Sequence, residues 1–154
     1  MSRYRDPLTK DLFSWEPPKV AVGYSNDVIG RGRLDNKIAR IIGQALRDAR
    51  DEGLRRSDVA SGISAFLNRP ISEAMLNKWS SEGSEDHRVP LDAFIGLVQV
   101  TGAKDLLGFV PGEFGLTVIE DEYAGLIEER LLDDHIEEML ARKKVLLAHK
   151  RAKR

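Results

Sequence analysis

The side chains with the most readable chemistry lie in one short stretch, from Ser72 to Ser81. An asparagine amide can donate to and accept from the edge of an adenine at once, and a lysine can donate to guanine or to a phosphate. Asn77 and Lys78 place both groups side by side. The residues that a helix here would present together are Ser72, Glu73, Ala74, Asn77, Lys78 and Ser81. We treat them as candidate base-reading residues; the alternative is a set of ordinary solvated side chains.

Two short helices joined by a tight connection are predicted to position these side chains. Ser57 is the expected N-cap of the first helix, whose apolar residues recur at helical spacing. Asn68-Arg69-Pro70 then ends it, because proline disfavours helical geometry in the residue before it. Ser72 is the expected N-cap of the second helix, with Ile71 and Leu76 placed to form a hydrophobic staple. Leu76 and Trp79 should be buried.

The run from Ile71 to Trp79 resembles the recognition-helix half of lambda-repressor-like helix-turn-helix proteins. The turn departs from that pattern, because Asn68-Arg69-Pro70 stands where a glycine is usual and the first helix is about one turn longer. The resemblance implies a helix-turn-helix domain that binds DNA. It covers roughly residues 34–110, since a proline-led helix from Val89-Pro90 to Thr101-Gly102 and a shorter apolar segment follow, as in that family.

The preceding helix is predicted from an apolar stripe at spacings of three and four, from Leu34 to Ala49. Its other face is basic, and further cations follow directly before the two short helices. A basic surface is typical of nucleic-acid binding, although a solvated helix face would look the same. The candidate phosphate contacts are Arg33, Lys37, Arg40, Arg55, Arg56 and Arg69.

The loop from Ser80 to Arg88 carries three acidic residues, with a helix stop expected at Gly83. Facing DNA, these acids would repel phosphates, so either the loop points sideways or the DNA interpretation is wrong. His87 beside Asp86 lacks a third ligand or a nucleophile at readable spacing. A hydrogen bond within the loop is therefore favoured over a metal or catalytic pair.

Residues 1–30 are predicted to form an extended N-terminal arm, because prolines and glycines interrupt them without sustained periodicity. Leu12, Phe13 and Trp15 concentrate apolar surface that needs a place to dock. One interpretation is that the arm packs on its own domain or on a second protomer. The other is that it is a peptide ligand for another protein. Asp11-Leu12-Phe13 resembles the tail of bacterial sliding-clamp-binding peptides, but Thr9 and Lys10 replace the expected glutamine and leucine.

Residues 113–154 are predicted to hold a short extended segment and then a helix from Asp121 nearly to the end. Acids fill the first half of this helix and bases the second, an order that complements the helix macrodipole. The same order would let two copies pair antiparallel, so we expect a homodimer.

Composition bounds the remaining function classes. With 24 basic and 25 acidic residues among 154 the net charge is near zero, and the chain contains no cysteine. Neither a disulfide framework nor a thiolate metal site is available, which suits a reducing cytoplasm. No membrane span or apolar signal region can be read. No phosphate-binding loop, metal cluster or nucleophile with its base can be read either, so we expect no enzyme, no cofactor and no metal.

The expected fold is therefore all-α: a lambda-repressor-like helix-turn-helix bundle over residues 31–112, with an extended arm before it and a long C-terminal helix after it. The whole chain, including Trp15-Glu16-Pro17-Pro18 and Glu85-Asp86-His87, is similar to small DNA-binding proteins of transposable, Mu-like bacteriophages and prophages. This implies a sequence-specific double-stranded DNA-binding protein in a bacterial cytoplasm, acting in transcription regulation or as a transposition accessory factor. The alternative is an adaptor that reuses the fold for protein contacts.

Overall fold

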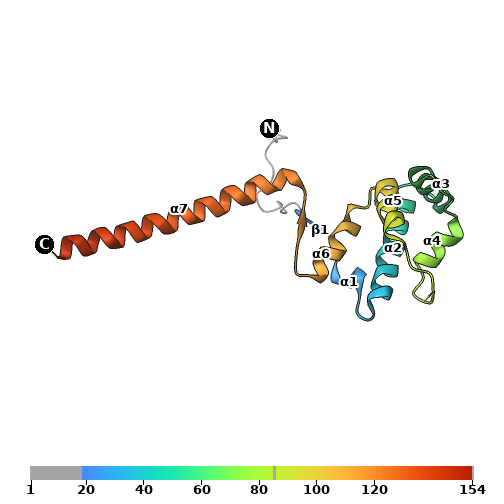
Figure 1. Ribbon diagram of the computed structural model, residues 1–154, viewed down its shortest axis with the longest axis horizontal. Helices are drawn as coiled ribbons and strands as arrows, with labels where there is room; N and C mark the ends of the chain where they lie inside the picture. The colour runs from blue at the N-terminus through green and yellow to red at the C-terminus, as the bar shows by residue number, and fades with distance from the viewer. Residues whose placement is uncertain (1–18, 85, 154) are drawn as a thin grey trace, which may run out of the picture.

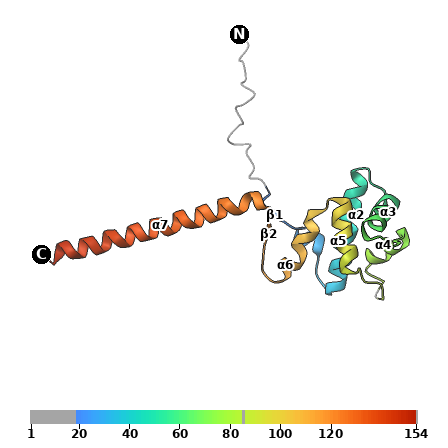
Figure 2. The same ribbon diagram turned by 45° about the horizontal axis from the view of Figure 1, so that its top comes forward.

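A computed structural model describes residues 19–84 and 86–153 and is mostly helical (Figure 1). In chain order the elements are β1 (Ala21–Val22), α1 (Asn26–Ile29), α2 (Leu34–Asp51), α3 (Arg56–Leu67), α4 (Glu73–Trp79), α5 (Leu91–Thr101), the 3₁₀ helix η2 (Lys104–Gly108), α6 (Phe109–Glu113), β2 (Val118–Ile119) and α7 (Asp121–Ala152). Helices α1 to α6 gather into one bundle, and α7 extends away from it (Figures 1 and 2). The predicted predominance of helix is confirmed, with one pair of short strands added within the described part.

The predicted apolar stripe of α2 packs into the core of the bundle. Ile41, Ile42 and Ala45 are fully buried, and Leu46 and Ala49 nearly so. The stripe is shorter than expected, because Leu34 in the first turn remains 55% exposed. Helix α2 therefore buries its middle and its second half, and its first turn lies at the margin of the core.

Local sequence signals explain how α3 and α4 are separated. Asn68 ends α3 in the left-handed conformation, with φ of 52°. Asparagine tolerates this geometry better than most residues, so Asn68 can end the helix where the lambda-repressor-like pattern has a glycine. Ser72 caps α4 as predicted, its side chain accepting a hydrogen bond from the backbone N–H of Met75 at 3.2 Å.

Three predicted helix boundaries need correction. Ser57 does not cap α3: the N-cap is Arg55, two residues earlier, and Asp58 Oδ2 accepts a hydrogen bond from the backbone N–H of Arg55 at 3.2 Å. Pro90 is the N-cap of α5 rather than its first residue. Helix α4 ends at Trp79, before the stop expected at Gly83. The C-terminal boundary of α5 is as predicted, since Gly102 takes the left-handed cap conformation there.

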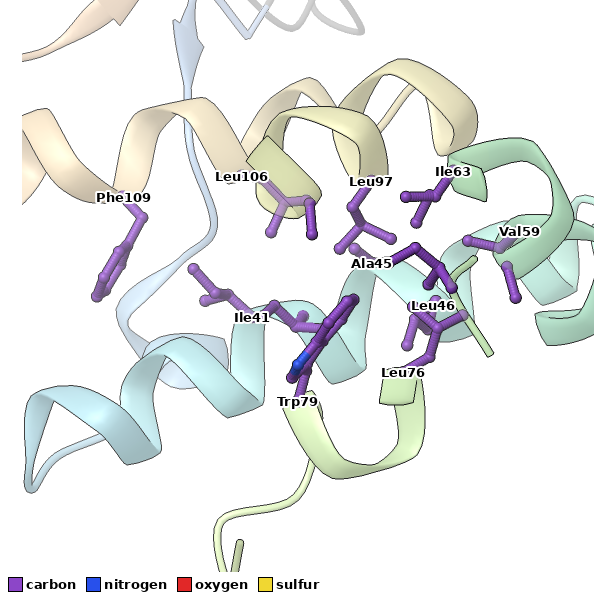
Figure 3. Packing of buried hydrophobic residues seen from close by; sticks show 14 residues of the cluster. Ile41, Ala45, Leu46, Val59, Ile63, Leu76, Trp79, Leu97, Leu106 and Phe109 are labelled. Carbon is purple, nitrogen blue, oxygen red and sulfur yellow. The ribbon is translucent and has the colours of Figure 1, made fainter. Parts of the chain in front are cut away.

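One hydrophobic cluster joins these helices (Figure 3). Its buried members are Ile41, Ile42, Ala45, Leu46, Val59, Ala60, Ile63, Ile71, Leu76, Trp79, Ala93, Leu97, Leu106 and Phe109. Both Ile71 and Leu76, the expected staple residues, belong to it. Figure 3 shows Leu76 and Trp79 of α4 pointing toward Leu46 and Ile41 of α2. The position of α4 is thus set by the core.

Residues 19–30 are not simply extended, which corrects the prediction for this part of the arm. Strand β1 pairs antiparallel with β2, Val22 opposite Val118, and a single turn of helix, α1, follows it. Asp105 holds the segment by accepting hydrogen bonds from the backbone N–H of Gly23 and from Lys19 Nζ, both at 2.8 Å. These contacts join residues more than 80 positions apart, so local periodicity could not reveal them.

Gly108 permits the close approach of β1 to η2. A Cβ atom at this position would overlap the backbone carbonyl of Val22. We expect Gly108→Ala to lower the free energy of unfolding by about 1 to 3 kcal/mol, as for other overpacked sites. Urea unfolding followed by circular dichroism measures this. Gly112→Ala is the matched control, because nothing lies within 4 Å of its Cβ position and alanine favours helix. Equal stability of the two variants would contradict the expected collision.

Helix α7 spans 32 residues, beginning at Asp121 as predicted. Of the extended segment predicted from Glu113 to Ile119, only Val118–Ile119 forms a strand, β2. Glu113 instead ends α6, and a turn follows at residues 114–115. Every described side chain of α7 except Tyr123 is exposed. Apart from Tyr123, the helix therefore gains little burial from its own bundle.

Candidate nucleic-acid interface

Helix α4 has one buried and one exposed face. Leu76 is fully buried and Trp79 is 6% exposed, while Met75 is partly buried beside them. Ser72, Glu73, Ala74, Asn77 and Lys78 are all exposed. We call these five residues the α4 face. The predicted division of this helix into a buried and an exposed side is confirmed, except that Ser81 lies beyond the helix end in the following loop.

Arg56 connects the start of α3 to the α4 face. Its Nη1 donates to Asn77 Oδ1 at 2.6 Å and to Ser80 Oγ at 3.2 Å. The contact orients the Asn77 amide and uses one lone pair of its oxygen. Within the described part of the chain, the second lone pair and both N–H groups have no other hydrogen-bond partner, and a bidentate contact to adenine requires such groups.

Arg47 of α2 lies at the same place; it belongs to the basic face predicted for this helix but was not among the six candidate phosphate contacts. A Cβ atom on Gly43 would lie 3.4 Å from Arg47 Nη1 and 3.7 Å from the backbone oxygen of Ser80, so the guanidinium and the end of α4 share this surface. Arg47 Nη2 donates to Gln44 Oε1 at 2.8 Å. The signal was available in the sequence: Arg47 follows Gly43 by one helical turn, off the apolar stripe.

Lys78 contacts the loop that follows α4. Its Nζ lies 3.2 Å from His87 Nε2. An ammonium group has only protons to donate, so this imidazole nitrogen is the acceptor. The His87 side chain thus bonds to α4 rather than within the loop as predicted, and the contact places the histidine beside the α4 face. Within the loop, the backbone N–H of His87 donates to the carbonyl oxygen of Ser84 at 3.1 Å.

Ion pairs fold the acidic loop back onto the first half of α2. Arg40 Nε and Nη2 donate to the two carboxylate oxygens of Glu82 at 2.8 and 3.0 Å. Arg88 Nη2 donates to Asp35 at 2.8 Å. Of the three acids of this loop, Glu82 is thus paired with a cation of α2. Its carboxylate points toward α2 and not outward beside the α4 face, as expected if the loop points sideways.

Five of the six candidate phosphate contacts form ion pairs within the chain. The pairs are Arg33 with Asp35 at 3.0 Å, Lys37 with Glu113 at 3.0 Å, Arg40 with Glu82 at 2.8 Å, Arg55 with Asp58 at 3.1 Å and Arg69 with Asp92 at 2.9 Å. Arg56 is the exception, since its partners on the described part of the chain are an amide and a hydroxyl. The five paired cations would have to exchange or share a carboxylate partner in order to bind a phosphate, whereas Arg56 would not.

The structure also separates these six residues in space. Lys37 lines a cavity of about 500 Å³ among β1, α1 and α6. Arg33 lines another, of about 580 Å³, with Trp79 and Ser81. Arg69 pairs with the first turn of α5. Arg56 hydrogen-bonds Asn77, a predicted base-reading residue. The single basic surface suggested by the sequence is thus divided among several sides of the bundle.

Hydrogen bonds within two of these ion pairs, Arg55–Asp58 and Arg69–Asp92, shift the pKa values of the aspartates. Bonds from Arg55 hold the pKa of Asp58 below its usual value, and bonds from Arg69 do the same for the pKa of Asp92. Both aspartates therefore stay ionised and paired at neutral pH. Their arginines keep a competing carboxylate next to any incoming phosphate.

The other predicted site is the docking arm, and the structure does not describe its residues. Leu12, Phe13 and Trp15, the candidate docking residues of the arm, lie outside the described residues. Within residues 19–84 and 86–153, no three His, Asp or Glu side chains are grouped so that they could hold a metal ion. No helix in that part of the chain is both long and apolar enough to cross a membrane.

Comparison of the chain with known protein families, with curated proteins and with solved structures finds no match.

Proposed function

We propose that this chain binds double-stranded DNA through the α4 face, as a helix-turn-helix protein. The observation that carries the proposal is the Arg56–Asn77 contact. It joins Arg56 at the start of α3, whose partners among residues 19–84 and 86–153 are an amide and a hydroxyl, to a candidate base-reading side chain on the exposed face of α4. A helix of this kind enters the major groove, where Asn77 and Lys78 can reach base edges and Arg47 and Arg56 the flanking phosphates.

Burial supports the same assignment. Leu76 and Trp79 fix α4 against α2, so that Asn77 and Lys78 are presented from a rigid helix rather than a loop. Glu82 is turned toward Arg40, which removes one source of repulsion beside that face. The role in phage or prophage transcription control, or in transposition, is proposed from the resemblance in sequence.

Replacement of Asn77 or Lys78 by alanine tests the proposal. Asn77→Ala should weaken binding by about 1 to 3 kcal/mol and relax the preference at one base. Lys78→Ala should weaken all sequences alike if the lysine contacts a phosphate. Because both side chains are exposed, the melting temperature should remain nearly unchanged. Fluorescence anisotropy with duplexes selected from the source genome measures the affinities.

Lys104→Ala is the matched control, since Lys104 lies in η2 and pairs with Glu120 at 2.9 Å, away from α4. It should bind like the parent. If the Asn77 and Lys78 variants fold and bind DNA like the parent, α4 is not the reading helix.

An adaptor function is the second candidate, favoured by one observation. Glu73 lies exposed on the α4 face with a charge that opposes phosphate, and most of the predicted phosphate contacts are occupied by carboxylates. Absence of duplex binding by the parent protein at low salt would overturn the DNA proposal and favour this second function.

A further inference from the structure

Helix α7 presents an unusual amount of apolar surface to water. Ten large apolar side chains along it are between 44% and 64% exposed, among them Leu132, Ile136 and Met139. Figures 1 and 2 show the helix standing clear of the bundle over most of its length. Isolated helices draw little stability from propensity alone, and exposed apolar surface of this kind marks an interaction site.

The second part of α7 concentrates this surface on one side. The residues that share this side, at spacings of three, four and seven, are Leu132, Ile136, Met139, Leu140, Leu146 and Leu147. We call them the α7 face. Ile127 and Leu131 point in other directions at 100° per residue. The interface suggested by the sequence is therefore restricted to residues 132–147.

Charge divides α7 at the same place. Residues 121–138 contain eight acidic side chains and one arginine, whereas residues 139–153 contain six basic side chains and no acidic one. Within the described part of α7 the ion pair is that of Arg130 with Asp134, at 2.9 Å. The helix thus leaves most of its charges without a partner of opposite sign on the same helix.

We infer that α7 pairs antiparallel with α7 of a second copy of this chain, through the α7 face. In this orientation each acidic half lies along a basic half, whereas parallel pairing would bring like halves together. A pair centred between Met139 and Leu140 sets Leu132 against Leu147 of the second copy. It also sets Glu129 against Lys150, and the aliphatic stem of Lys143 covers Ile136. The pairing does not depend on DNA.

Sedimentation equilibrium of the full chain tests the association. The protein should be a dimer at micromolar concentration. A double variant, Ile136→Asp with Met139→Asp, should weaken dimerisation roughly 100-fold or more, because it removes four apolar side chains from one seam. The matched control is Ile127→Asp with Leu131→Asp, which lies off the α7 face and should leave the dimer intact. All four residues are exposed in the single chain, so the bundle should remain folded.

The absence of cysteine allows a direct test of orientation. A single Lys150→Cys protein carrying one spin label places the two labels of an antiparallel dimer about 30 Å apart, from the rise per residue. A parallel dimer would place them only about 10 Å apart, the usual distance between packed helices. A label at Arg142→Cys, near the centre, should give a short distance in either case.

Three results would overturn the inference: a monomer at micromolar concentration, a short distance between labels at position 150, or a dimer that survives the Ile136 and Met139 changes. The last would also show that the chain associates through another surface. A monomer that binds DNA would leave the function of the α4 face untouched, so the two proposals fail separately.

Discussion

Replacement of Trp79 by alanine is expected to lower the free energy of unfolding by about 3 to 5 kcal/mol. The indole is 6% exposed and belongs to the cluster that holds α4 against α2. It also forms part of the wall of the 580 Å³ cavity, beside Ile38 and Ala39. Neighbours that already border a hollow cannot easily collapse into the space that the ring leaves.

Urea unfolding followed by circular dichroism measures the loss, since fluorescence would report the missing indole itself. Trp79→Phe, which keeps an aromatic ring, should lose much less. DNA binding by Trp79→Ala should disappear only under conditions that unfold the protein. A variant of unchanged stability that no longer binds would instead place Trp79 in contact with DNA.

Salt dependence is expected to reveal which cations meet phosphates. Each neutralised phosphate contributes a slope of about 0.9 to the fall of log affinity with log salt. If Arg47 and Arg56 are the phosphate contacts, the slope for each α4 face bound to DNA is about 1.8, and a fourfold rise in salt weakens binding roughly 12-fold. Participation of the carboxylate-paired cations would raise the slope further.

Single substitutions separate the two groups of cations. Arg56→Ala should lower the slope by about 0.9, because it removes one phosphate contact. Lys37→Ala should leave the slope unchanged, since Lys37 is held by Glu113 on the side of α6. Titrations of the three proteins from 50 mM to 200 mM salt provide the comparison. A smaller slope for Lys37→Ala would mean that the binding surface extends around α2.

The helices of the bundle were predictable because their signals are local. The apolar spacing of α2, the cap at Ser72 and the stop at Gly102 each depend on residues within one or two turns. Ser57 misled because serine is a better N-cap than arginine by residue type alone. What decided the boundary was Asp58, which accepts a hydrogen bond from the backbone N–H of Arg55.

The candidate site was predictable only in part. The exposed side of α4 follows from helical periodicity once Leu76 and Trp79 are assigned to the core. The pairing of Arg69 with Asp92, and of Lys37 with Glu113, joins residues from separate elements. Such pairs cannot be predicted from spacing along the chain. The sequence therefore suggested six equivalent cations, whereas the structure pairs five of them with carboxylates and Arg56 with an amide and a hydroxyl.

The pairing of β1 with β2 brings the two ends of the bundle together. Strand β1 precedes helices α1 to α6 and β2 follows them. Their pairing therefore holds the start and the end of the bundle side by side, just before α7 begins. In both views α7 departs from this closure, and α4 lies at the far side of the bundle (Figures 1 and 2). A ligand held along α7 therefore leaves the α4 face unobstructed. If the α4 face binds DNA and α7 binds a second copy of the chain, as proposed, both surfaces can be occupied at the same time, and one dimer would then bind DNA through two α4 faces.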